Sequence, residues 1–308
     1  MSTTSTPPLP AERLTKGPFW LAIAMVVVTI VTILWGAMTT STGSGLAFTG
    51  WPLSDGKLMP ERSYTTVPGF LEHFHRIFAS LAGLLALWLA LWLSHGKLGD
   101  AKARKTAWFG GFLILTQGVF GGVGVLLELP VFTSVTHATL AQLTLATFAW
   151  SAYQLSGRYR QTPPAEGVAP GTGRKLVMFA LGILVVQTIV GAIARHSNSP
   201  HALWTHVGNA FVVFLVATIA TAFAIGRMGD TPGIRGLARA IVRLLILQIA
   251  LGFVALAIRN NAGKTPENVA NLGTSACCAA DPDGQHHRLH REAWRSLGPR
   301  AERRWRTG

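Results

Sequence analysis

Leu71-Glu72-His73-Phe74-His75-Arg76 is the stretch from which this chain is best approached, because it puts a carboxylate, two imidazoles and a guanidinium at the mouth of an apolar run. Ionisable groups inside or at the edge of a membrane need partners. If the stretch is helical, Glu72 and His75 are three residues apart and share one face, whereas His73 points elsewhere. The remaining sequence should then supply the groups that this face meets.

The composition is that of a membrane protein. Of the 308 residues, 49% are hydrophobic and 13% are charged, whereas about a quarter of a soluble domain is charged. The formal charge is +14, but the basic residues fall in short segments between apolar runs, which argues against nucleic-acid binding. Cys277 and Cys278 are the only cysteines and are adjacent, so no CxxC pair or disulfide framework is predicted.

Seven runs are long and apolar enough to cross a bilayer, which takes about 20 helical residues. The first run is too long for a signal peptide, so we expect it to be a retained span. The chain is therefore predicted to be an all-α polytopic membrane protein with spans over 18–40, 71–94, 107–127, 131–155, 176–195, 201–226 and 240–258.

The connections alternate in charge. Basic residues gather in 97–105, 158–175 and 227–239, and the positive-inside rule places these segments and the N-terminus in the cytoplasm. The opposite connections are nearly neutral. The largest of them, 41–70, is rich in Gly, Pro and Ser and is a candidate lid over the first two spans.

A helix-pair repeat runs through the chain. The third, fifth and seventh spans carry QxxxG, ending at Gly121, Gly191 and Gly252, and the second, fourth and sixth carry a histidine one to two turns from the outer end. With a rise of about 1.5 Å per residue, all three histidines lie within roughly 10 Å of the outer surface. These histidines are His75, His137 and His206.

A single histidine in a membrane helix is often a hydrogen-bonded packing residue, but three at matched depth favour a shared function. Neutral imidazole binds zinc, copper and haem iron. Zinc needs three or four ligands around one point, whereas single histidines on separate helices suit a haem clamped axially. The glycines of QxxxG would let a flat ring approach the backbone, although small-residue helix packing is their more ordinary interpretation.

Glu72 and Arg76 each have a structural and a functional interpretation. A carboxylate in the first turn of a helix is favoured by the helix dipole, but beside a ligand histidine it could position a reacting group or relay protons. Arg76 could neutralise Glu72 or bind a haem propionate through its planar fork. We expect His73, His95, His196 and His201 to be interface or loop residues.

Four motifs lie between residue 35 and about residue 275. They are Thr42-Gly-Ser-Gly-Leu46 followed by Trp51-Pro52, Glu72-His-Phe-His-Arg76, Thr136-His-Ala-Thr-Leu-Ala-Gln142, and Gly191-Ala-Ile-Ala-Arg195-His196 followed by Trp204-Thr-His206. In this order they resemble the motifs of the haem A synthase family of cytochrome oxidase assembly. The resemblance implies eight spans in two pseudo-symmetric four-helix bundles, each with a histidine pair for haem, in a bacterial plasma membrane.

The resemblance also implies oxidation of a ring methyl of haem O to the formyl group of haem A, with haem b as cofactor. His75 and His137 would face the substrate iron, Glu72 would lie beside the reacting site, and His206 would be an axial ligand of haem b. The implied partners are haem O, haem O synthase, cytochrome oxidase assembly proteins, membrane lipid and an electron acceptor of unknown identity. Further cofactor-binding candidates are Arg76, Arg195, Gly121 and Gly191.

Three features depart from the family pattern. Thr40 stands where members often carry arginine, and the outer loop lacks the cysteine pair that some members carry. The repeat predicts a histidine-bearing eighth span after Ser275, but the chain continues into an arginine-rich tail. We interpret this tail as an out-of-frame or truncated end; the alternative is a genuine basic tail, in which His286, His287 or His290 would bind metal.

We therefore expect a haem A synthase whose second bundle lacks its last helix. The alternatives are a di-haem b-type electron-transfer cytochrome and an inactive truncated remnant. Glu72 and the long outer loop favour the enzyme, because an electron carrier needs neither a carboxylate beside one haem nor a lid. The expected segments are an N-terminal tail (1–17), a substrate-haem bundle (18–155), a cytoplasmic linker (156–175), a truncated cofactor-haem bundle (176–275) and a basic tail (276–308).

Overall fold

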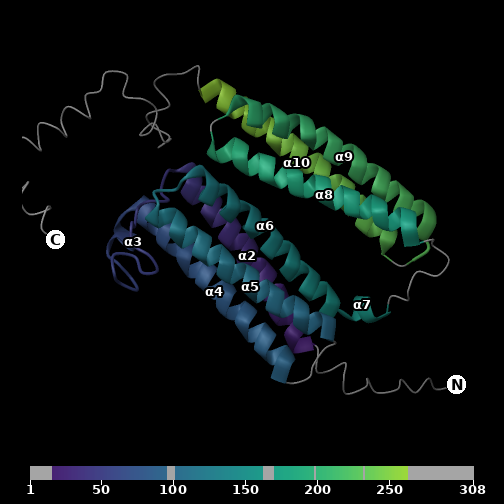
Figure 1. Ribbon diagram of the computed structural model, residues 1–308, viewed down its shortest axis with the longest axis horizontal. Helices are drawn as coiled ribbons and strands as arrows, with labels where there is room; N and C mark the ends of the chain where they lie inside the picture. The colour runs from purple at the N-terminus through teal and green to yellow at the C-terminus, as the bar shows by residue number, and fades with distance from the viewer. Residues whose placement is uncertain (1–15, 96–100, 162–169, 198, 232, 263–308) are drawn as a thin grey trace, which may run out of the picture.

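The computed structural model describes residues 16–95, 101–161, 170–197, 199–231 and 233–262, and within these ranges the chain is helical without a sheet (Figure 1). Seven helices are long and two are short. Their bounds are α2 (Lys16–Ser41), α3 (Arg62–Thr65), α4 (Val67–His95), α5 (Ala101–Leu126), α6 (Val131–Leu155), α7 (Gly157–Gln161), α8 (Pro170–His196), α9 (Pro200–Met228) and α10 (Ile234–Ala262).

The first four long helices close into a bundle. α2 packs on α4 and α6, and α5 packs on the same two helices. The buried apolar core of this bundle lies toward the end that carries the basic connections, where Met25, Leu89, Leu93 and Phe148 are fully buried. Between helices that cross a membrane, such side chains stabilise the bundle mainly through van der Waals packing. The opposite half of the bundle holds the histidines.

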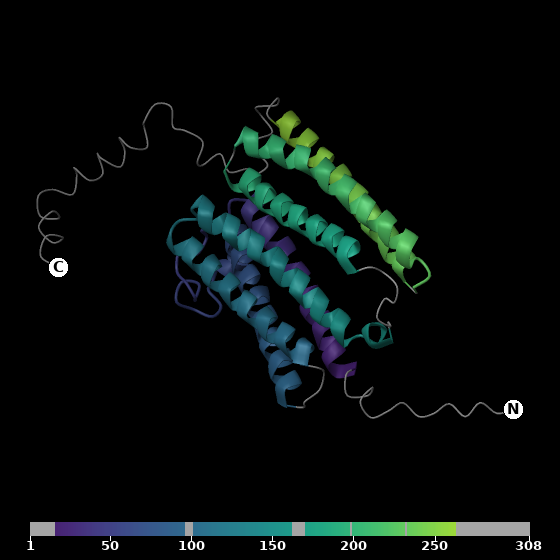
Figure 2. The same cartoon turned by 45° about the vertical axis from the view of Figure 1, so that its right-hand side comes forward.

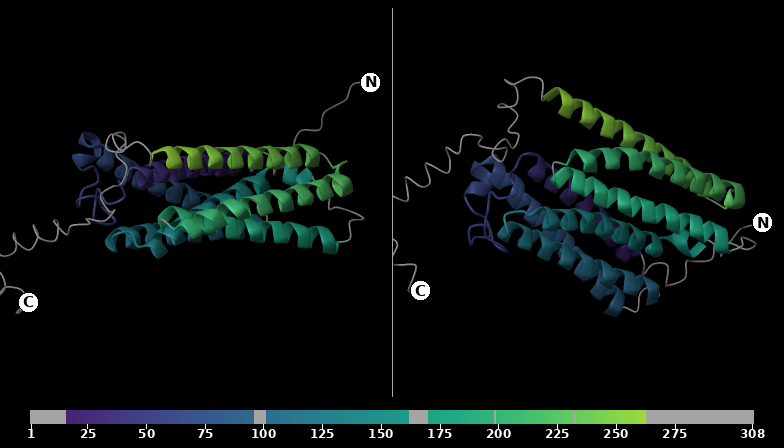
Figure 3. Two further views of the ribbon diagram at one scale, coloured as in Figure 1. Left: turned by 90° about the horizontal axis from the view of Figure 1, so that it is seen from above. Right: turned by 45° about the horizontal axis from the view of Figure 1, so that its top comes forward.

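The second half of the described chain consists of three helices. α9 packs on α8 and α10, and α8 packs along α6 of the first bundle, as Figure 2 shows. α10 lies farthest from the first bundle (Figure 3), and its most apolar stretch is 0% buried. The predicted eighth span and the basic tail after Ser275 lie outside the described residues.

Six helices are long and apolar enough to cross a membrane, namely α2, α4, α5, α8, α9 and α10. The chain is thus an integral membrane protein of at least the six spans that the described residues provide. α6 has the predicted bounds but falls short of this apolarity, because it contains five threonines, two serines, two glutamines and His137. It contacts α2, α5 and α8, and four of its polar side chains, Thr133, Thr144, Ser151 and Gln154, are buried.

Several helices begin earlier than hydropathy alone predicts. α4 starts at Val67 rather than at residue 71, and α5 starts at Ala101 rather than at 107. The added turns of α5 contain the basic residues Lys102, Arg104 and Lys105. Long basic side chains can extend from a helix end toward water, so a helix can continue beyond its apolar part.

Candidate functional site

His75 of α4 lies against a glycine of α2. A Cβ atom added to Gly36 would come within 2.7 Å of His75 Cε1, so only glycine leaves room for the imidazole. The ring Nδ1 lies 3.1 Å from the carbonyl oxygen of Thr32. A carbonyl can only accept, so Nδ1 carries the proton and donates it, which leaves the Nε2 lone pair as the metal-binding position.

His137 of α6 repeats this geometry against α5. A Cβ on Gly121 would come within 2.8 Å of His137 Cε1, and Nδ1 donates to the carbonyl oxygen of Gln117 at 3.0 Å. In both cases the accepting carbonyl precedes the glycine by four residues. The Gln117 amide nitrogen lies 3.4 Å from His137 Nε2 and donates to it, so this glutamine contacts both ring nitrogens.

The two imidazoles meet inside the first bundle. Their ring centroids are 6.4 Å apart, with an angle of 78° between the planes. Because a metal–imidazole bond is about 2 Å long, two rings that share one metal ion through nitrogen have centroids separated by roughly 6 Å. No group of three or more His, Cys, Asp or Glu side chains in the described ranges could hold a metal ion. The donor set therefore fits axial ligation of a haem iron and does not fit a structural zinc site.

His206 of α9 has the same glycine contact but different hydrogen bonds. A Cβ on Gly191 would come within 2.7 Å of its Cε1, yet its Nδ1 is buried without a hydrogen-bond partner. The side chain of Gln187 is used differently from that of Gln117: its amide donates to the His206 carbonyl at 3.1 Å and accepts from Asn209 at 2.8 Å. The predicted partner of His206 would follow Ser275, outside the described residues.

The glycine part of the repeat extends to a helix where sequence reasoning missed it. Gly36 contacts its histidine as Gly121 and Gly191 do, whereas a Cβ on Gly252 would meet nothing within 4 Å. The missed signal is a TxxxG pattern, Thr32 to Gly36, in place of QxxxG. At Gly36, Gly121 and Gly191 the atoms nearest to an added Cβ belong to the histidine ring. The flat ring that approaches the backbone of these glycines in the structure is therefore an imidazole.

Glu72 and Arg76 hold the outer loop. The backbone N–H of Phe48 donates to Glu72 Oε2 at 2.9 Å, and Arg76 forms an ion pair with Glu72 Oε1. Arg76 also donates to the carbonyl oxygens of Gly50 at 2.7 Å and Phe48 at 2.9 Å. Glu72 and Phe48 are both buried.

The shared face predicted for Glu72 and His75 is thus only part of the arrangement, because the Glu72 carboxylate binds the loop and the His75 ring binds α2. A three-residue step leaves the two side chains at an angle around the helix axis. That angle is enough to give them different neighbours.

His73, predicted to be an interface or loop residue, lies in α4 and contacts the outer loop. Its Nδ1 lies 3.1 Å from Ser54 Oγ, both residues are buried, and its Nε2 has no hydrogen-bond partner. One helical turn of α4, from Glu72 to Arg76, therefore docks the loop at three points.

Arg195 joins the two halves of the molecule. From the last turn of α8 it donates to Ser41 Oγ at 2.6 Å and to the Ala37 carbonyl at 3.4 Å. Both acceptors lie at the C-terminal end of α2, where a cation is favoured by the helix dipole. Ala37 directly follows Gly36, the neighbour of His75, so Arg195 contacts the end of the helix that supports the first histidine.

Comparison with known proteins agrees with the resemblance that the four sequence motifs indicate. The COX15-CtaA family model, described as "Cytochrome oxidase assembly protein", matches residues 18–212, a range that includes His75, His137 and His206. No solved structure matches the chain.

Three curated relatives carry the name "Heme A synthase". The protein of Symbiobacterium thermophilum is 28% identical over 59% of this chain and 60% of its own length. The protein of Staphylococcus epidermidis is 24% identical over 77% of this chain and 85% of its own length. The protein of Chelativorans sp. is 28% identical over 44% of this chain and 39% of its own length.

Proposed function

The chain belongs to the COX15-CtaA family of cytochrome oxidase assembly proteins, and on this basis we propose that it is a haem A synthase, which oxidises a ring methyl of haem O to the formyl group of haem A. The single observation that carries the proposal is the pair of imidazoles of His75 and His137, 6.4 Å apart with both Nδ1 atoms bonded to backbone carbonyls. The names of the relatives support the choice of reaction.

In this proposal His75 and His137 would hold the iron of the substrate haem through Nε2. Their Nδ1–H groups stay on the carbonyls of Thr32 and Gln117, which fix the tautomer and the ring orientation; such outer contacts tune a metal ligand. The Gln117 amide, which donates to His137 Nε2 in the structure, would have to release that lone pair for iron to bind. Haem iron, when bound, would supply one-electron redox chemistry, and the electrons removed from the methyl group would pass to the electron acceptor.

Glu72 is proposed to hold a proton near the reacting group. Its two oxygens are positioned by the Phe48 N–H and by Arg76, and the docked loop above it limits access of water, which strengthens electrostatic interactions. Arg76 and Arg195 are also proposed to contact the cofactor. The hydrogen bonds that both side chains make to the protein would position them for this contact.

His206 is proposed to bind haem b in the second half, with Gly191 giving its ring access to α8. The buried, unpartnered Nδ1 of His206 is compatible with a site completed by a further group. We place this site on the same outer side of a bacterial plasma membrane as the first, with the N-terminus in the cytoplasm. The proposed partners are haem O synthase, cytochrome oxidase assembly proteins and an electron acceptor.

The shared glycine–histidine contact at Gly191 and His206 favours a second candidate, a di-haem b-type electron carrier in which both sites hold permanent haem. Expression of the full chain in a host that makes haem O, followed by pigment extraction, separates the candidates. We expect haem A or its alcohol to accumulate. Haem B alone would indicate the carrier, and a chain without haem would indicate an inactive remnant.

A further inference from the structure

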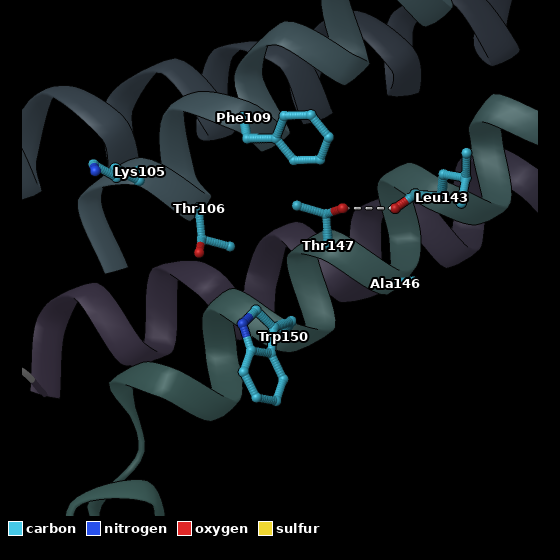
Figure 4. Close-up of a pocket in the computed structure, with 7 residues that line it drawn as sticks. All are labelled: Lys105, Thr106, Phe109, Leu143, Ala146, Thr147 and Trp150. Atoms are coloured by element: carbon cyan, nitrogen blue, oxygen red, sulfur yellow. Dashed lines mark hydrogen bonds between the residues drawn. The ribbon is translucent and has the colours of Figure 1, made fainter. Parts of the chain in front are cut away.

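A groove of about 470 Å³ lies between α5 and α6, near the end of the first bundle that carries the basic connections (Figure 4). It is shallow and largely open to its surroundings. It is separate from the histidine pair, which lies on α4 and α6 toward the other end of the bundle. The lining residues are Lys105, Thr106, Phe109, Leu143, Ala146, Thr147 and Trp150.

The walls of the groove are apolar although two threonines line it. Thr147 Oγ1 donates to the Leu143 carbonyl at 2.8 Å, and Thr106 Oγ1 donates to the Lys102 carbonyl at 3.0 Å. Both hydroxyl groups are thus satisfied within their own helices. The exposed fractions of Phe109 and Trp150 are 54% and 49%, so the groove is lined by accessible apolar surface.

Lys105 is the only charged group among the lining residues, and it lies at one end of the groove. Its side chain is exposed, and in the part of the chain that the structure describes no carboxylate lies within ion-pair distance of it. α5 runs inward from this end, so Phe109 is one turn deeper than Lys105. α6 runs the opposite way, so Leu143 is deeper than Trp150. The groove therefore changes from cationic to apolar along its length.

Aromatic side chains mark this end of the bundle as a membrane interface. The Trp150 ring lies 5.5 Å from Tyr153 and 6.2 Å from Tyr159. On α5, Trp108 donates its indole N–H to Ser94 Oγ at 3.0 Å. Tryptophan and tyrosine are enriched at the level of the lipid headgroups, which is also the depth at which Lys105 would meet a phosphate.

We propose that the groove binds one anionic phospholipid, with its phosphate at Lys105 and one acyl chain between Phe109 and Trp150. The apolar walls would suit any acyl chain, whereas the cation at the mouth selects a negatively charged headgroup. In the predicted orientation this end faces the cytoplasmic leaflet, whose anionic lipids attract juxtamembrane basic residues. The site does not depend on the proposed haem chemistry.

Native mass spectrometry of the full chain in detergent tests this site, with phosphatidylglycerol and phosphatidylcholine as probes. We expect one phosphatidylglycerol to be retained in preference to phosphatidylcholine. Lys105→Gln should weaken phosphatidylglycerol binding roughly fivefold, the factor for one basic residue near an anionic headgroup, and Lys105→Arg should retain it. Ala146→Phe should reduce binding of both lipids by filling the groove.

Lys175→Gln is the matched control, because Lys175 is exposed on the same predicted side of the membrane but belongs to α8. It should leave lipid binding unchanged. Equal retention of the two lipids by the wild type, or equal losses in Lys105→Gln and Lys175→Gln, would overturn the site. Binding of a neutral quinone in place of phospholipid, unaffected by Lys105→Gln, would also overturn it. Thermal melting curves check that each variant folds. If Ala146→Phe does not fold, the comparison of Lys105→Gln with Lys105→Arg still tests the site.

Discussion

The first and second halves of this chain share a glycine–histidine contact but differ in how the histidine is hydrogen-bonded. In each half a histidine ring lies against a glycine of the preceding long helix. In the first half two such rings face each other, and backbone carbonyls hold both Nδ1 atoms. In the second half His206 is the only histidine so placed in the described ranges, and its Nδ1 has no partner. A glycine–histidine contact therefore makes room for an imidazole, and the hydrogen bond to Nδ1, which fixes the tautomer and leaves Nε2 free of a proton, distinguishes the two rings of the first half from His206.

Loss of a ligand should have the largest effect. His137→Ala removes half of the axial donor set in the first bundle, so we expect haem O conversion to fall below detection. His206→Ala should leave the first site able to bind haem while removing the spectrum of haem b. Absorption spectra and extracted pigments measure both. An unchanged b-type spectrum in His206→Ala would count against that ligand.

Replacement of Glu72 should have the second-largest effect on haem O conversion. If the carboxylate handles a proton, Glu72→Ala should lower conversion by about 10²–10⁴-fold and leave haem binding largely intact. Ser54→Ala is the matched control, because it removes the contact of the outer loop with His73 without touching the carboxylate. Turnover and limited proteolysis of the loop separate the two roles. Equal losses of turnover in both variants would assign Glu72 to loop docking alone.

Substitution of the glycines should reduce haem affinity only where an added Cβ would contact a histidine ring. A methyl group at Gly121 would displace the His137 ring, so Gly121→Ala should weaken haem binding in the first site by about 10–100-fold, as for other changes that misorient a ligand. Gly191→Ala should act in the same way on His206 alone. Gly252→Ala is the control, because nothing lies within 4 Å of the added atom. A loss of haem affinity in Gly252→Ala equal to that in Gly121→Ala would refute the steric explanation.

The contact between the halves should have the smallest effect. Arg195→Gln removes an exposed hydrogen bond to Ser41, so the free energy of unfolding should fall by about 0.5–1.5 kcal/mol. A double-mutant cycle with Ser41→Ala measures the coupling of the two side chains by thermal unfolding in detergent. A coupling energy of zero would show that Arg195 does not link α8 to α2.

Much of this arrangement could be predicted from the sequence because it depends on local periodicity. Apolar runs gave all seven long helices, and the matched positions of His75 and His137 predicted that they would meet. Whether α6 is apolar enough to cross the membrane was harder to predict. A helix packed against three others tolerates more polar residues than a span that faces lipid.

Other features depend on contacts distant in sequence. The docking of Glu72 on Phe48 joins residues 24 positions apart, so no helical pattern indicates it. Gly36 was missed because Thr32 stands where the repeat elsewhere has glutamine. The different state of His206 could not be predicted either, since the same QxxxG motif precedes His137 and His206, and only the structure shows where each glutamine side chain hydrogen-bonds.

The most direct test is electron paramagnetic resonance of the oxidised chain carrying His206→Ala, purified from a host that makes haem O. If His75 and His137 clamp one haem iron, this variant should show a single low-spin signal typical of two imidazole ligands, and the signal should disappear when His137→Ala is added. Persistence of the same signal in the His137→Ala/His206→Ala double variant would contradict the assignment of the first site.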